Sequence, residues 1–208
     1  MARVGFRIAK YNKITNGTYA TIPSDSKVPT FEKVIDEKFA PEYNNAELYA
    51  SDVLAESDYS FKKGVLTITV VDDNDKIGAE LLGNKYNPIV TSGESPNTTT
   101  TGGDVTSNVE DIAPEFGYGH IIPKIVNGDR KYKVEFFPRV KFTKANGDSA
   151  KTKGDSVEFG TTTIEGTVFP LEKALNKLKA LDWENHKTFD TYDDAETYLD
   201  SLLTPSTD

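Results

Sequence analysis

The stretch from Phe116 to Phe169 constrains the fold of this chain more than any other. It contains three runs rich in Tyr, Phe, Val, Ile and Thr, separated by turn-forming clusters. Asn127-Gly128-Asp129 follows the first run, and two clusters, Asn146-Gly147-Asp148 and Lys153-Gly154-Asp155, follow the second. Because Asn-Gly and Gly-Asp accept the positive φ angles of tight reversals, the pattern predicts a meander of long β-strands.

The composition is that of a folded domain without cross-links. The 208 residues can bury a substantial core, so we expect a single domain over 1–208. The chain has no cysteine, which excludes a disulfide framework and a thiol nucleophile. The basic first residues lack an apolar run, and no window has the apolar length of a membrane helix, so we expect a soluble, cytoplasmic protein.

The net charge of -9 argues against a conventional nucleic-acid-binding protein, because affinity for phosphates comes from Lys and Arg. Local basic residues do occur in Lys131-Tyr132-Lys133 and Arg139-Val140-Lys141. They alternate with apolar residues, which is typical of the solvated face of a strand.

Further strands are expected before the meander. Alternation in residues 4–8 predicts a strand or an extended arm within an N-terminal region, 1–30. Residues 18–22 predict a short strand, and residues 31–39 another that Pro41 should end. The run GVLTITVV, Gly64 to Val71, is the clearest buried strand.

Residues 46–57 permit two interpretations. Alternate residues from Leu48 to Glu56 would share one face of a strand, whereas the Ala, Glu and Leu content favours a helix.

Helix signals occur at three places. Asp73 or Asn74 can cap a first helix that ends at Gly83. Thr191 can cap a C-terminal helix that ends before Pro205. Its apolar stripe is Tyr192, Ala195, Leu199 and Leu202. The leucine spacing over 171–178 predicts a third, shorter helix.

Between the first helix and the meander, residues 86–111 are rich in Gly, Ser, Thr and Asn. Such residues cannot form a packed core, so the composition predicts a long flexible loop.

No motif argues for an enzyme. The carboxylates at Asp72 to Asp75 imitate part of a calcium loop but place Ile77 where an oxygen ligand belongs, so helix capping explains them better. Gly117-Tyr118-Gly119 lacks the third glycine of a dinucleotide fingerprint and fits a close backbone approach. His120 and His186 have no metal-binding spacing.

Four blocks of the chain, in order, resemble the major tail proteins of long-tailed phages and prophages of Gram-positive bacteria. The first two are AELYASDVLAESDYSFKKGVLTITVVDD and EFGYGHIIPKIVNGDRKYKVEFFPRVKF. The other two are TKGDSVEFGTTTIEGTVF and FDTYDDAETYL. Together the blocks cover most of residues 46–203 outside the Thr-rich segment.

The resemblance implies a mainly β fold: a β-sandwich with a short flanking α-helix, a C-terminal α-helix and a long loop. It also implies hexameric rings that stack into a hollow tail tube, each subunit adding four strands to an inner barrel. Twenty-four strands spaced about 4.8 Å and tilted about 40° give a backbone diameter of roughly 45–50 Å, wide enough for duplex DNA.

The same resemblance implies candidate functional residues. Acids that should face the channel are Glu47, Asp52, Glu56 and Glu135, and loop residues that should contact the next ring are Thr91, Ser92, Pro96, Thr101 and Ser107. An acidic wall would repel DNA and let it slide during ejection. The implied partners are other copies of the chain, a tape-measure protein, and terminator and tip proteins, in a virion tail assembled in the host cytoplasm. No cofactor, metal or reaction is implied.

The alternative is a surface-displayed carbohydrate-binding or adhesin-like β-sandwich, with a small hydrolase as a third option. Tubes or rings in the microscope would favour the first interpretation, and glycan binding by strict monomers the second.

Overall fold

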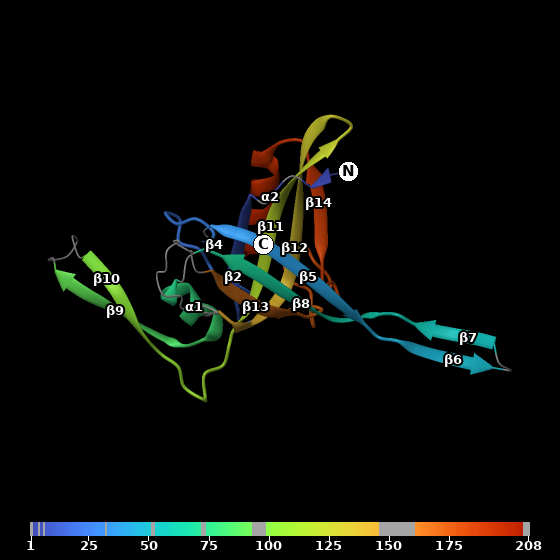
Figure 1. Ribbon diagram of the computed structural model, residues 1–208, viewed down its shortest axis with the longest axis horizontal. Helices are drawn as coiled ribbons and strands as arrows, with labels where there is room; N and C mark the ends of the chain where they lie inside the picture. The colour runs from blue at the N-terminus through green and yellow to red at the C-terminus, as the bar shows by residue number, and fades with distance from the viewer. Residues whose placement is uncertain are drawn as a thin grey trace, which may run out of the picture.

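The protein is mainly β, as the sequence predicts (Figure 1). The computed structural model describes residues 2–3, 5, 7–31, 33–50, 53–71, 74–92, 99–145 and 161–205. One antiparallel sheet of ten strands forms the body of the molecule. Its strands are β1 (Ala2–Arg3), β2 (Ile8–Thr15), β3 (Thr18–Tyr19), β4 (Thr30–Phe31), β5 (Val34–Tyr43), β8 (Phe61–Val70), β11 (Glu115–Val126), β12 (Asp129–Lys144), β13 (Thr162–Val168) and β14 (Asn185–Phe189).

The predicted meander is β11, β12 and β13, paired in that order. Asn127 and Gly128 join the first two strands with φ angles of 53° and 93°, so this predicted turn is confirmed. The other two predicted turn clusters lie outside the described residues.

A bulge at Pro138 divides β12 into two halves, which belong to different layers of the folded sheet. Phe116 and Tyr118 on β11 face Val140 and Phe137 on β12, so β12 carries one extra residue there. Before the bulge β12 pairs with β14, and after it with β13. The sheet therefore folds over itself into a sandwich, and β5 and β8 cross diagonally over β11 and β12 (Figure 1).

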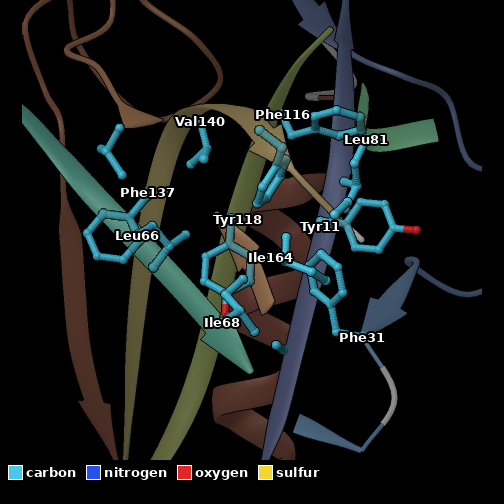
Figure 2. Close-up of a cluster of buried hydrophobic side chains, with 14 of the residues drawn as sticks. Tyr11, Phe31, Leu66, Ile68, Leu81, Phe116, Tyr118, Phe137, Val140 and Ile164 are labelled. Carbon is cyan, nitrogen blue, oxygen red and sulfur yellow. The ribbon is translucent and has the colours of Figure 1, made fainter. Parts of the chain in front are cut away.

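The first core lies between these two layers. Figure 2 shows Leu66 and Ile68 of β8 facing a group of aromatic residues from β2, β4, β11 and β12. Burial along β8 alternates, with Gly64, Leu66, Ile68 and Val70 buried, because alternate side chains of a strand point to one face. The expected buried strand is thus confirmed.

The second core lies on the other face of β11 and β12, under α2 (Tyr192–Leu203). Thr191 caps this helix by accepting a hydrogen bond of 3.2 Å from the Asp194 amide, as predicted. Leu199 is fully buried, and a Cβ atom at Gly119 would lie 2.5 Å from its Cδ1. Gly119 is therefore a close-approach glycine that seats the helix on the sheet.

The first predicted helix is α1 (Asp75–Leu82). The Asn74 side chain accepts hydrogen bonds of 3.2 Å from the Lys76 and Ile77 amides, and Gly83 ends the helix at a φ of 76°. The capping interpretation of this polar cluster is confirmed for Asn74.

The third predicted helix, over 171–178, is wrong. Leu175 and Leu178 exchange backbone hydrogen bonds of 3.1 and 3.0 Å as an isolated bridge. Between them Asn176 has a φ of 51°, and its side-chain amide donates to the carbonyls of Leu202 and Thr204 at 3.0 and 2.6 Å. Capping the end of α2 thus outweighs the local helix propensity.

Two hairpins stand outside the body (Figure 1). The helix interpretation of 46–57 is wrong, because this segment forms β6 (Ala46–Ala50) and β7 (Val53–Asp58), paired antiparallel. The loop expected over 86–111 is also corrected: it contains β9 (Lys85–Ser92) and β10 (Thr99–Thr106), again paired. Polar composition misled the prediction because a hairpin needs backbone pairing but little apolar burial.

One further expectation changes, and one is decided between its alternatives. Pro41 does not end a strand but lies within β5, which is tolerated because β5 is at the edge of the sheet. For the region 1–30, expected as an arm or as strands, the structure shows strands, since β2 pairs along β11 and buries Ala9 and Tyr11.

Candidate functional site

The most distinctive surface feature is the hairpin of β6 and β7, which we call the acidic arm. It continues the β5–β8 pair away from the body, so that four strand segments form one long bent hairpin (Figure 1). At the bend the Asn44 amide donates to the Ser60 carbonyl at 2.8 Å, and the Asn44 side chain donates to Ser60 Oγ at 2.8 Å. These bonds continue the pairing of the two strands through the bend.

Aromatic side chains brace the base of this arm. The rings of Phe61 and Trp183 are stacked, with centroids 3.9 Å apart and an angle of 11° between their planes. The centroid of the Phe39 ring lies 5.9 Å from that of Trp183. Tyr43 meets Phe61 edge-on at 6.1 Å and is half exposed. This group of aromatic rings extends the first core outward, because Phe39 also contacts Phe137, with ring centroids 4.6 Å apart.

The charged residues of the acidic arm are all of one sign. Between Ala46 and Asp58 the sequence has four acidic residues, Glu47, Asp52, Glu56 and Asp58, and no basic residue. Glu47 and Glu56 are exposed on β6 and β7, and the Glu47 carboxylate accepts a hydrogen bond of 2.6 Å from Tyr59 Oη. Asp52 lies outside the described residues. Two of the four predicted channel acids thus share one projecting element.

Glu135, the fourth predicted channel acid, requires a correction. It is 8% exposed and lies between the two layers of the body. His120 and Lys133 both pair with it, so it is not a free charge on an exposed wall. The solvated face expected for Lys133 is also wrong, since its side chain is 15% exposed.

The second projecting hairpin, β9 and β10, is called the polar arm. Tyr86 crosses it, its ring lying on Gly103, where no side chain would fit. At its base Asn84 Nδ2 donates to Ser107 Oγ at 2.9 Å. The predicted ring-contact residues fall on this arm as follows: Thr91 and Ser92 on β9, Thr101 on β10, Ser107 just after β10, and Pro96 outside the described residues.

The sheet of the body ends at β5 in an open edge. In the described residues no strand pairs with the outer side of β5, and Ile35 on it is 53% exposed. An edge of ten residues offers backbone donors and acceptors to another strand. The acidic arm is therefore continuous with an unpaired sheet edge.

A buried ionic cluster lies at one end of the first core. His120 Nδ1 is 3.1 Å from Glu37 Oε2, and His120 Nε2 is 3.2 Å from Glu135 Oε2. Tyr118 Oη donates to the same Glu37 oxygen at 2.6 Å. A pocket of about 480 Å³ opens onto the cluster. No local pattern indicates that Glu37 and His120, 83 positions apart in the sequence, meet in the fold.

The pKa values in this cluster follow from burial and pairing. Burial alone would raise the pKa of the Glu135 carboxyl, but hydrogen bonds from His120 and Lys133 outweigh burial and hold that pKa well below its ordinary value. Burial, followed by the charge of Glu37, raises the pKa of the Tyr118 hydroxyl well above its ordinary value.

This arrangement does not suit general base catalysis. Both ring nitrogens of His120 face carboxylates, so neither is directed at a nucleophile or a substrate. Among the described residues no group of three or more His, Asp or Glu side chains is placed to hold a metal ion. The cluster serves as a structural joint between layers.

The sequence matches no protein-family model and no curated protein. In the part of the chain that the structure describes, no helix has the length and apolar character needed to cross a bilayer.

Proposed function

We propose that this chain is a structural subunit that polymerises through its arms and sheet edge into the tail tube of a long-tailed phage. The observation that carries the proposal is the acidic arm, a two-stranded projection continuous with the open edge of β5. The resemblance of four sequence blocks to major tail proteins supports the same conclusion.

The arms favour assembly because they are poorly stabilised in a single chain. An isolated two-stranded hairpin is marginal in water, and pairing with further strands stabilises it. The acidic arm and the polar arm each form a two-stranded sheet of their own. Ring closure would pair the β5 edge and the acidic arm with neighbouring copies, and the polar arm would contact the next ring.

The charge of the acidic arm suits a conduit for DNA. Duplex DNA carries one negative charge per about 1.7 Å, so a basic channel would retain it. Four acids without a basic residue would instead repel the duplex if the arm lines the channel. In this proposal DNA passes through the tube without specific binding. The chain needs no cofactor, and its partners are the tape-measure, terminator and tip proteins.

The test is negative-stain microscopy and size-exclusion chromatography of the purified protein over a range of concentrations. We expect rings or tubes from the parent chain. A variant that lacks residues 46–58 should remain a folded monomer, because none of the described side chains of this segment belongs to either core of the body.

Two results would contradict the proposal: strict monomers of the parent chain at every concentration, or normal tubes from the variant without the acidic arm. Thermal unfolding of both proteins is the control that the body is intact.

A carbohydrate-binding sandwich remains the second candidate because of the aromatic residues at the base of the acidic arm. Tyr43 and Tyr59 are 50% and 56% exposed. However, the faces of Phe61 and Trp183 are stacked on one another, which leaves them less free to stack on a sugar ring. Glycan binding by a monomer, lost in a Tyr43→Ala variant, would favour this candidate.

A further inference from the structure

We propose that His120 carries a proton on both ring nitrogens at neutral pH and acts as a pH-sensitive latch. The latch holds strand β5, and with it the base of the acidic arm, against the β11–β12 layer. It depends on the geometry of a single chain and stands whether or not the chain assembles.

The latch joins three strands of two layers. His120 on β11 and Glu135 on β12 are directly opposite in one layer of the sandwich. Glu37 belongs to β5 in the other layer, where it is opposite Ile68 of β8. The side chains of His120 and Glu37 are only 3% and 7% exposed, so this contact between layers is largely hidden from water.

The position of Glu37 makes the contact relevant to the arm. β5 is held on one side by β8 and has an open outer edge. Its chain continues through Tyr43 into β6 of the acidic arm. A contact between Glu37 and the opposite layer therefore restrains the strand that carries the arm.

A doubly protonated ring accounts for both contacts when Glu37 and Glu135 are ionised. A neutral imidazole has one N–H donor and one lone pair, and only the imidazolium presents N–H groups on both sides. A lone pair 3.1 or 3.2 Å from a carboxylate oxygen would be repelled. The Nδ1 contact with Glu37 is a charge–charge contact rather than an aligned hydrogen bond, and so depends on the positive charge of the ring.

The surrounding charges also favour the imidazolium. The titratable groups around the cluster are Asp36 and Glu37 of β5, Tyr118 of β11, Lys133 and Glu135 of β12, and Glu184 ahead of β14. Lys133 is paired with Glu135, and across β11 from His120 stands Ala9 of β2, which is uncharged. Four carboxylates against one lysine leave a negative field that a protonated ring balances.

One alternative places the proton on Glu37 and leaves His120 neutral. In that state the Glu37 carboxyl would donate to Nδ1, and Nε2–H would donate to Glu135. The contact between layers would then be a neutral hydrogen bond, which does not weaken when imidazolium titrates. The two states differ in the protonation of the imidazole, which can be measured directly.

The first measurement is nitrogen NMR of the histidine rings at neutral pH. The chain has only two histidines, and a His186→Gln variant assigns the signals. His186 has a 61% exposed side chain and is the reference. We expect both His120 nitrogens to give the imidazolium signature. The signature of a neutral ring would overturn the latch and support a protonated Glu37.

The second measurement is thermal unfolding from about pH 6 to about pH 9, a range that begins near the pKa of an unperturbed imidazole, about 6.5, and extends above it. We expect the melting temperature of the parent chain to fall as the pH rises. The His120→Gln variant should melt about 6 °C or more lower at the acidic end and lack this fall, because it breaks a buried charge pair. His186→Gln should follow the parent.

The third measurement places the effect on β5. Amide exchange of Val34–Tyr43 should accelerate about tenfold or more in His120→Gln, while that of Thr162–Val168 in β13 changes less. If His120→Gln does not fold, Glu37→Gln removes the same contact with less disturbance and should give the same pattern. Equal acceleration of both strands, or a pH dependence kept in the variants, would contradict the latch.

Discussion

The body and the two arms are stabilised in opposite ways. In the body, β11 and β12 have one face under the first core and the other under α2, so their side chains are buried from both directions. In the acidic arm the described side chains of Ala46, Glu47 and Glu56 to Asp58 are exposed. The contrast indicates that the body determines the stability of the chain, and that the arms are available for contacts with other molecules.

The comparison predicts that substitutions in the body change the free energy of unfolding, whereas those in the arms change assembly. The largest effect is expected from Leu199→Ala, because Leu199 is fully buried against Gly119. It should lower the free energy of unfolding by about 2–5 kcal/mol, measured by denaturant titration. Val109→Ala is the control, since Val109 is 99% exposed. Equal stability of Leu199→Ala and the parent would mean that α2 is an appendage.

The next prediction concerns the loss of stability at acidic pH. The folded chain holds the pKa of Glu135 below its ordinary value, so Glu135 contributes stability at neutral pH that is lost as the pH falls below the ordinary carboxyl range. Between about pH 6 and about pH 3 the parent should lose about 2 kcal/mol more than Glu135→Gln. Glu47→Gln, at an exposed position, is the control. The prediction fails if both variants respond to acid alike.

An effect of similar size is expected at Asn176, which caps α2 from a residue with positive φ. Asn176→Ala loses the hydrogen bonds and strains the backbone, at a cost of about 2 kcal/mol. Asn176→Gly loses only the bonds and should cost about 1 kcal/mol. The difference between the free energies of unfolding of the two variants, measured by denaturant titration, gives the cost of the backbone strain separately from the cost of the lost hydrogen bonds. An identical cost for both would show that the backbone conformation contributes nothing.

The smallest effect on stability, and the sharpest test of the comparison, comes from the acidic arm. Glu47→Lys combined with Glu56→Lys should change the free energy of unfolding by less than about 0.5 kcal/mol. If the arm lines a channel, these changes should leave assembly intact and slow DNA ejection, more strongly at low salt. Normal ejection from tails that carry both lysines in the channel would remove the arm from the DNA path.

The features that the sequence predicted correctly depend on local physics. Asn127-Gly128 reverses the chain because of its backbone freedom, and Asn74 and Thr191 cap helices through their own side chains. The alternation in residues 64–70 marks a buried face because strand geometry has a period of two. Each of these signals lies within a few residues, so no tertiary contact is needed to interpret it.

The features that could not be predicted from local sequence patterns depend on contacts between distant residues. The leucines of 171–178 do not form a helix because Asn176 is required at the end of α2. Strands formed within 86–111 because backbone pairing is possible for almost any composition, and the same pairing decided 46–57, for which the sequence had left strand and helix open. The cluster of Glu37, His120 and Glu135 exists only because the sheet folds over itself at Pro138 and brings β5 across β11. Local patterns thus determined the elements, while the tertiary fold determined which charges became buried partners, because burial and pairing depend on distances that a linear pattern does not contain.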